Sequence, residues 1–180
     1  NPVTAKEILK LPYRLWSSWV NHYRSQVFAI SLKNLEQDPI ALSPDAEYVP
    51  PLDLGGSVDL TISPDNRWAA FVTNMDADLA RSTNNDIFIV DLKNILSDND
   101  KTLKISDNPA NDNNPVFSPD GEKIAYLSMK RPGFEADQYD LIIYNLKTKE
   151  RKNFTEDYDL CFTNPMWSPK GDVILGNVLK

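Results

Sequence analysis

Short runs rich in apolar residues, separated by polar segments, recur along the 180-residue chain. Three of them, residues 68–73, 123–128 and 172–178, directly follow a polar turn sequence. Short apolar runs bounded by turn-forming residues are typical of β-strands, whereas helices show longer runs with a period of 3.6 residues. The pattern therefore predicts an all-β chain of many short strands.

The three turn sequences share one pattern. They read Ile62-Ser63-Pro64-Asp65-Asn66, Phe117-Ser118-Pro119-Asp120-Gly121 and Trp167-Ser168-Pro169-Lys170-Gly171, with serines 55 and 50 residues apart. Proline presets φ in a tight turn, Asp or Asn bonds back to the backbone, and Gly tolerates positive φ. We expect the apolar residue before each serine to point between neighbouring sheets. Ser43-Pro44-Asp45 is excluded as a copy, because Pro50-Pro51 follows it rather than a strand.

A second pattern recurs out of phase with the first, over residues 28–34, 88–94 and 142–148. Each unit thus holds a strand, the serine turn, a second strand, a linker and a third strand. A polar reversal and a fourth strand follow, at residues 101–105 and 150–154. Four antiparallel strands in about 50 residues describe one blade of a β-propeller.

The predicted strands make two complete blades and two half blades. Their expected ranges are 27–32, 57–62, 67–73, 86–92, 101–105, 114–117, 123–129, 139–146, 150–154, 164–167 and 172–178. Propellers close with about 4–8 blades, so we expect the whole chain, 1–180, to be part of one propeller domain. Its expected divisions are a helical or irregular insertion (1–25), the end of one blade (26–56), two blades (57–113 and 114–163) and the start of another (164–180).

The N-terminal segment carries a different signal. Thr4 and Glu7 match a helix capping box, which predicts a short helix from Ala5 to Leu11 before Pro12. The next apolar residues have helix-like spacing, and we expect them to pack on the outside of a blade: Leu15, Trp16, Trp19 and Val20.

Composition narrows the classes of function. The 19 Lys and Arg against 26 Asp and Glu give a net charge of -7, which disfavours nucleic acid as a partner. No apolar run approaches the roughly 20 residues needed to span a bilayer. The single cysteine, Cys161, excludes an internal disulfide and a cysteine-based zinc cluster.

The chain lacks the residues of a catalytic or metal site. His22 is the one histidine, and the sequence from Gly55 to Asp59 begins like a nucleophile elbow but has Asp59 where the final glycine belongs. The acidic stretches 76–78 and 98–100 lack the glycine and distal glutamate of an EF-hand. We therefore expect no catalytic residue, no metal and no cofactor.

Function is expected in the linkers between second and third strands. Residues 74–85 and 129–139 far exceed the two to five residues that join adjacent strands, and excess loop is where binding residues concentrate. In the second linker, Phe134, Glu135, Asp137 and Tyr139 are the candidate binding residues. The alternative is that Glu135 and Asp137 merely pair with the basic residues at 130–131 on a solvated surface.

Two linker motifs and the serine turns resemble the propeller domain of prolyl-oligopeptidase-family serine peptidases. The motifs are the run from Arg81 to Phe88 and the loop from Arg131 to Asp137, and they are most similar to the dipeptidyl-peptidase V and acylaminoacyl-peptidase branch. The resemblance extends from about Trp16 to Val178, including the stretch 24–28. Lys170 departs from the usual Asp of the turn and weakens that copy slightly.

The resemblance implies a two-domain parent in which the propeller covers an α/β-hydrolase domain and admits short peptides. The catalytic Ser, Asp and His would belong to that domain, which this sequence lacks, so the chain itself should be inactive. Glu135 and Asp137 would bind the free N-terminus of a dipeptidyl substrate, with Phe134 and Tyr139 as apolar walls. A periplasmic or secreted location is favoured over a cytoplasmic one. The rival classes are a TolB-like protein-binding platform and a ligand-binding propeller lectin.

Overall fold

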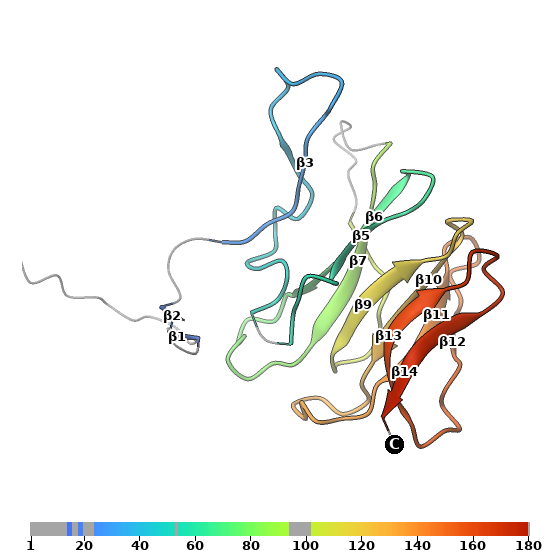
Figure 1. Cartoon of the computed structure of the whole chain (residues 1–180). Coiled ribbons are helices and arrows are strands. Elements are labelled where there is room, and N and C mark those ends of the chain that lie inside the picture. Colours follow the sequence, from blue (N-terminus) through green and yellow to red (C-terminus); the bar gives the residue numbers. More distant parts are fainter. Residues whose placement is uncertain (1–13, 16–17, 20–23, 53, 94–101, 180) are drawn as a thin grey trace, which may run out of the picture.

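The computed structural model describes residues 14–15, 18–19, 24–52, 54–93 and 102–179, and these contain strands but no helix (Figure 1). The strands are β1 (Arg14–Leu15), β2 (Ser18–Trp19), β3 (Phe28–Ala29), β4 (Ile40–Ala41), β5 (Leu60–Ile62), β6 (Trp68–Asn74), β7 (Asn85–Asp91), β8 (Leu103–Lys104), β9 (Asp112–Phe117), β10 (Lys123–Ser128), β11 (Asp140–Asn145), β12 (Arg151–Asn153), β13 (Cys161–Trp167) and β14 (Ile174–Leu179). Every strand pair is antiparallel, and an isolated parallel bridge joins Ser25 to Tyr48.

Two four-stranded sheets follow the order of the chain, β5 to β8 and then β9 to β12. The pair β3–β4 precedes them and the pair β13–β14 follows them (Figure 1). This confirms the prediction of two complete blades and two half blades. The short strand β4 was not predicted, and β13 begins three residues earlier than expected.

The N-terminal prediction is tested only in part. The expected helix from Ala5 to Leu11 lies outside the described residues. Residues 14–15 and 18–19 pair as two short antiparallel strands instead of continuing a helix. Apolar residues four positions apart also fit the two arms of a tight hairpin, so the spacing did not distinguish the two structures.

The middle strand β6 is buried on both faces. Ala70 and Val72 pack toward the next blade, in a core that includes Ile124 of β10. Ala69 and Phe71 face the other way, in a core shared with the half blade β3–β4. Because successive side chains of a strand point to opposite faces, a strand between two sheets must be apolar at nearly every position.

The serine turns are closed by side-chain hydrogen bonds. Ser118 Oγ donates to Asp120 Oδ1 at 2.5 Å and accepts from the Lys123 N–H at 2.9 Å. Gly121 takes the left-handed backbone conformation, with φ of 71°. The hydrogen bond from Ser118 lowers the pKa of the Asp120 carboxyl. The turn at Ser63 is built in the same way, with Asn66 at φ of 57°.

The third turn keeps this geometry without the usual aspartate. Lys170 stands at that position, and Ser168 Oγ instead donates to Asp172 Oδ1, two residues further along, at 2.7 Å. The Val173 N–H still donates to Ser168 Oγ at 3.2 Å, and Gly171 has φ of 72°. The carboxylate partner of the serine has therefore moved to the other side of the glycine.

The apolar residues before the serines differ in their surroundings. Phe117 packs against the core between the two complete blades. Trp167 reaches the preceding sheet, where its Nε1 donates to the carbonyl of Val116 at 3.1 Å. Ile62, by contrast, is 57% exposed, so the expectation that all three point between packed sheets is wrong for this residue.

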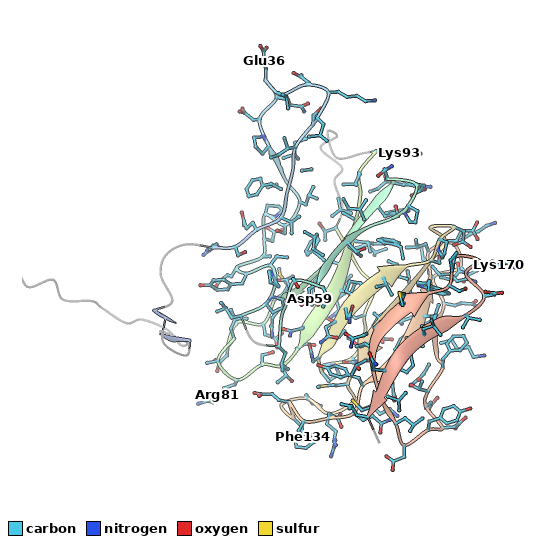
Figure 2. All side chains as sticks on the ribbon, viewed as in Figure 1. Glu36, Asp59, Arg81, Lys93, Phe134 and Lys170 are labelled. Atoms are coloured by element: carbon cyan, nitrogen blue, oxygen red, sulfur yellow. The ribbon has the colours of Figure 1, made fainter. Side chains whose placement is uncertain are left out.

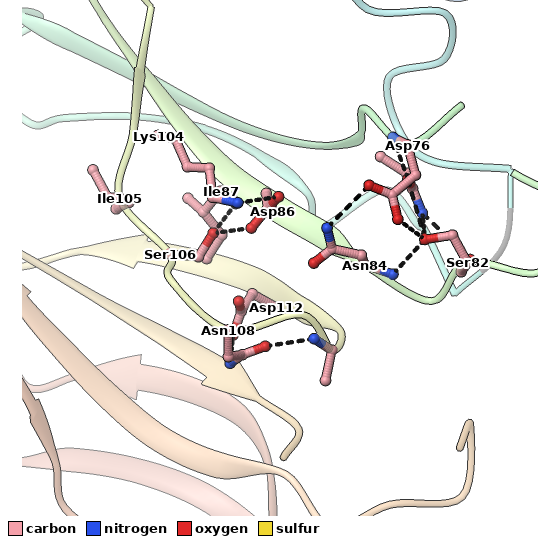
Figure 3. A network of polar contacts seen from close by, with 12 residues as sticks. Asp76, Ser82, Asn84, Asp86, Ile87, Lys104, Ile105, Ser106, Asn108 and Asp112 are labelled. Atoms are coloured by element: carbon pink, nitrogen blue, oxygen red, sulfur yellow. Dashed lines mark hydrogen bonds and ion pairs between the residues drawn. The ribbon is translucent and has the colours of Figure 1, made fainter. Parts of the chain in front are cut away.

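A buried carboxyl group lies at one end of the interface between the complete blades. Asp112 is fully buried, and its Oδ1 accepts from Asn108 Nδ2 at 3.1 Å, whereas its Oδ2 has no partner among the described residues (Figure 3). Burial raises the pKa of Asp112 to about 7 against hydrogen bonds from Ser128 and Asn108, and the nearby carboxylates of Asp86 and Asp107 raise it further.

The first prediction tests the serine turn. Ser118→Ala should lower the free energy of unfolding by roughly 1–2 kcal/mol, because it leaves the Lys123 N–H without its hydroxyl acceptor. Chemical denaturation measures the loss. Ser57→Ala makes the same change at an exposed serine and should have almost no effect; equal effects of the two substitutions would contradict the role given to the turn.

The second prediction concerns Asp112. Asp112 binds its proton more tightly in the folded protein than in the unfolded chain. The stabilisation that comes from the protonated carboxyl is therefore full below about pH 4 and is lost as the pH rises to about 7. Asp112→Asn mimics the neutral form. The free energy of unfolding of this variant, relative to wild type, should therefore increase by roughly 2–4 kcal/mol as the pH rises from about 4 to about 8. Parallel stability curves of the two proteins over this range would contradict it.

Candidate functional site

The two long loops lie at the same end of the complete blades. The first long loop (residues 75–84) joins β6 to β7, and the second long loop (residues 129–139) joins β10 to β11. Arg81 of the first and Phe134 of the second both lie at this end, whereas Lys93 lies at the opposite end (Figure 2). In an up-and-down sheet, the connection after every second strand returns to the same edge, so the two loops of equivalent position come together.

Asp137 holds the base of the second long loop together. Its Oδ2 accepts from the backbone N–H groups of Lys130 and Arg131 at 2.9 and 2.8 Å. Its Oδ1 accepts from Nε and Nη2 of Arg131 at 2.8 and 2.6 Å. Burial of Asp137 would raise its pKa, but the Arg131 guanidinium and these N–H groups lower it to about 2. Asp137 is therefore a buried carboxylate with its charge compensated inside the loop.

Lys130 has a different partner from the one suggested by its position in the sequence. Its Nζ lies 3.0 Å from Oδ2 of Asp140, the first residue of β11. The same oxygen accepts from Asn153 Nδ2 of β12 at 2.8 Å. The hydrogen bond to Asp140 raises the pKa of the Lys130 ammonium. The alternative of surface pairs is thus present for Arg131 with Asp137, while Lys130 is tied to the sheet.

The tip of the loop presents an aromatic ring and a carboxylate to solvent. The Arg131 guanidinium lies over the Phe134 ring at 4.2 Å from its centroid, and Phe134 remains 43% exposed. Glu135 is exposed, and its side chain makes no hydrogen bond or ion pair with the described residues. Of the two predicted carboxylates, Glu135 is therefore the one available to a ligand.

Tyr139 lies at the other end of this loop and reaches toward β9. Its hydroxyl accepts from Asn111 Nδ2 at 2.6 Å and from Asn113 Nδ2 at 3.0 Å. Burial raises the pKa of the Tyr139 phenol against these two hydrogen bonds. Its hydroxyl is thus committed to the blade, and the role of Phe134 and Tyr139 as two walls of one substrate pocket stays a prediction.

The first long loop is organised by a separate polar network (Figure 3). Asp76 accepts from Ser82 Oγ at 2.5 Å and from Asn84 Nδ2 at 3.3 Å. Asn74, at the end of β6, donates to the Ser82 carbonyl at 3.3 Å. Arg81 lies 3.7 Å from Asp78 at the exposed end of the loop. These contacts connect the two ends of the loop to each other and to the end of β6.

An open groove of about 490 Å³ lies between the two loops. The first long loop lines it with polar side chains, among them Asp76, Arg81 and Thr83, and the second contributes Pro132 and Gly133. The sequence singled out both linkers as unusually long, but it gave no signal that they enclose a common groove. That property depends on how two blades are placed beside one another.

Within the described part of the chain, no three His, Cys, Asp or Glu residues are grouped to hold a metal ion. The described residues also include no helix of the length and apolar character that a membrane span requires. His22 and the acidic stretch 98–100 lie outside the described residues.

Sequence comparison finds relatives that are named dipeptidyl-peptidases. The chain is 33% identical over 156 residues to a probable dipeptidyl-peptidase 5 of Emericella nidulans, an alignment that covers 82% of this chain and 20% of the relative. It is 29% identical over 170 residues to dipeptidyl-peptidase 5 of Porphyromonas gingivalis, covering 92% of this chain and 24% of the relative. The chain thus spans about a quarter or less of the length of these curated relatives.

Structure comparison bears on the fold. TolB from Acinetobacter baumannii superposes with a TM-score of 0.53 at 13% identity, over 85% of this chain and 32% of the TolB chain. No family model matches the sequence. The resemblance to the dipeptidyl-peptidase V branch is confirmed by the named relatives, and the antiparallel blades by the TolB propeller. The chain is therefore a segment of β-propeller blades whose sequence is similar to part of the proteins named dipeptidyl-peptidase 5.

Proposed function

We propose that this chain is the non-catalytic, substrate-gating propeller segment of a serine exopeptidase of the prolyl oligopeptidase family. The observation that carries the proposal is its similarity, over most of its length, to proteins named dipeptidyl-peptidase 5. The blades would cover an α/β-hydrolase domain that holds the catalytic residues, exclude folded proteins and admit short peptides.

The long-loop end of the blades is the face that we assign to substrate. The opposite end carries the short serine turns, whose hydrogen bonds are satisfied within the turn. The long loops instead offer an open groove and an unpaired carboxylate, the features that a ligand can use. TolB-like function as a protein-binding platform is the alternative, but a likeness at 13% identity supports the fold alone.

Glu135 and Asp137 are proposed to serve the binding of the substrate's free N-terminus, Glu135 by direct contact and Asp137 by holding the loop. A dipeptidyl peptidase must recognise an α-ammonium group at a fixed distance from the scissile bond, and charge-assisted hydrogen bonds to carboxylates do this well. Glu135 is exposed and would contact the ammonium. Asp137, whose oxygens are occupied by Arg131 and the backbone, would keep the loop in the conformation that presents Glu135. Phe134 and Tyr139 would supply apolar surface beside it.

The third prediction tests the anchoring carboxylate in the full-length protein. Glu135→Gln should lower kcat/KM for dipeptide substrates with a free amine by roughly tenfold, since a charge-assisted hydrogen bond is lost. It should leave cleavage of N-acylated peptides unchanged, because they carry no ammonium group. Asp137→Asn should lower both, since it loosens the loop.

Glu122→Gln is the matched control for this experiment. Glu122 is also exposed, but it lies beside the serine turn at the opposite end of the blade. This substitution should change neither activity. Equal losses on free and acylated substrates with Glu135→Gln, or no loss on either, would return Glu135 to a surface role.

The fourth prediction locates the catalytic serine. A fluorophosphonate, which reacts with activated serine hydroxyls, should label the full-length protein on a peptide outside residues 1–180. Peptide mapping by mass spectrometry identifies the labelled residue. Labelling of a serine within these residues, removed by its substitution with alanine, would contradict the proposal that this segment is non-catalytic.

A further inference from the structure

One hydrogen bond joins the tip of the second long loop to the first long loop, across the interface between blades. The backbone N–H of Gly133 donates to Oγ1 of Thr83 at 2.8 Å, although the two residues are 50 positions apart in the chain. Thr83 is 8% exposed, so its hydroxyl is held away from bulk solvent. Both residues also line the groove between the loops.

The acceptor side of this bond is rigid. The Thr83 carbonyl accepts from the Asn85 N–H at 2.8 Å, and the Asn84 N–H donates to Ser82 Oγ at 3.0 Å. Asn85 in turn donates from its side chain to Asn111 Oδ1 at 2.9 Å, which ties this part of the loop to the neighbouring blade. The Thr83 hydroxyl is therefore fixed before any ligand arrives.

The donor side depends on few contacts. The Asp137 carboxylate holds residues 130–131 at the base of the second long loop. Beyond them, the described contacts within the tip are two turn hydrogen bonds, from the Phe134 N–H to the Arg131 carbonyl at 3.4 Å and from the Asp137 N–H to the Phe134 carbonyl at 3.1 Å, and the Arg131 guanidinium over the Phe134 ring. Gly133 has φ of 74°, a conformation that leaves its N–H free to point out of the turn toward Thr83. Glu135 follows two residues later.

We propose that Thr83 is a positioning residue that fixes the tip carrying Phe134 and Glu135 from the adjacent blade. Rigid placement of a binding residue matters because ordering a loop on association costs free energy. A tip that is already held by Thr83 avoids part of that cost. The inference rests on the proposed function in assigning Glu135 to substrate, but the bond to Gly133 can be tested without substrate.

Thr83→Val is the decisive variant in the full-length protein. It keeps the shape of the side chain and removes the hydroxyl acceptor, so hydrogen exchange at the Gly133 amide should become at least about tenfold faster. Exchange in β10 and β11 should not change. Thr83→Ser keeps the hydroxyl and should restore slow exchange. Unchanged exchange at Gly133 in the valine variant would overturn the proposal.

Thr102→Val is the matched control. Thr102 is exposed, and its hydroxyl makes no hydrogen bond with the described residues. It should leave exchange at Gly133 as in wild type. If Thr83→Val also accelerates exchange throughout the blades, the variant has loosened the fold rather than the tip; normal exchange at Gly133 in Thr83→Ser then still supports the proposal, and fast exchange overturns it.

Kinetics separate this inference from the proposed function. For free-amine dipeptide substrates, Thr83→Val should raise KM about threefold to tenfold with kcat within a factor of two, and Thr83→Ser should restore KM. If Glu135→Gln raises KM but Thr83→Val does not, Thr83 does not position the tip for binding and the inference fails. If neither variant changes KM while exchange at Gly133 accelerates, the assignment of Glu135 to substrate fails and the positioning of the tip by Thr83 stands.

Discussion

The burial of both faces of the middle strands is the constraint on which this structure depends. Ala69 and Phe71 of β6 pack against one neighbouring sheet, and Ala70 and Val72 pack against the other. A sheet patterned in this way cannot leave either face to water without exposing about half of its apolar side chains. Each blade is therefore stable only between neighbours, and polar contacts such as that from Trp167 Nε1 to the β9 backbone reinforce the stacking.

This stacking also places two kinds of connection at opposite ends of each blade. Antiparallel strands return their connections alternately to the two ends of a blade. One end carries serine turns whose hydrogen bonds are completed locally, at Ser63, Ser118 and Ser168. The other end carries the two long loops, where the Thr83 hydroxyl of one accepts from the Gly133 backbone N–H of the other, and where Asn85, at the start of β7, donates to Asn111 beside the next blade. The long loops are therefore held partly by contacts with another blade, whereas the serine turns are closed by their own residues.

The fold was largely predictable from the sequence because its signals are local. Pro, Asn and Gly mark the turns, and the strands next to them are apolar on both faces. Strand β4 was missed because it has two residues, in an apolar run of three, which is shorter than the runs typical of strands. Ile62 was expected between packed sheets, yet it is largely exposed. Its burial would depend on neighbouring strands, not on its own turn.

The site was predictable only in part, because several of its contacts depend on residues of another strand or another blade. The length of both linkers and the acidic residues at 135 and 137 could be read from the sequence. Pairing of Asp137 with the basic residues at 130–131 was one of the two alternatives, and it holds for Arg131. The partner of Lys130 was not predicted, because Asp140 belongs to the next strand. The bond between Thr83 and Gly133 has no sequence signal at all, because it depends on the spacing between two blades.

The aspartate at position 172 has a consequence for how such chains are recognised. Its carboxylate accepts the hydrogen bond of the Ser168 hydroxyl from the position after Gly171. The hydroxyl–carboxylate pair is therefore kept although the residue after the proline is lysine. A search that demands aspartate at one fixed place in the motif would pass over this blade and undercount the repeats. Divergence in propeller sequences can thus exceed divergence in their turns, because the chemistry that closes the turn can be supplied from more than one position.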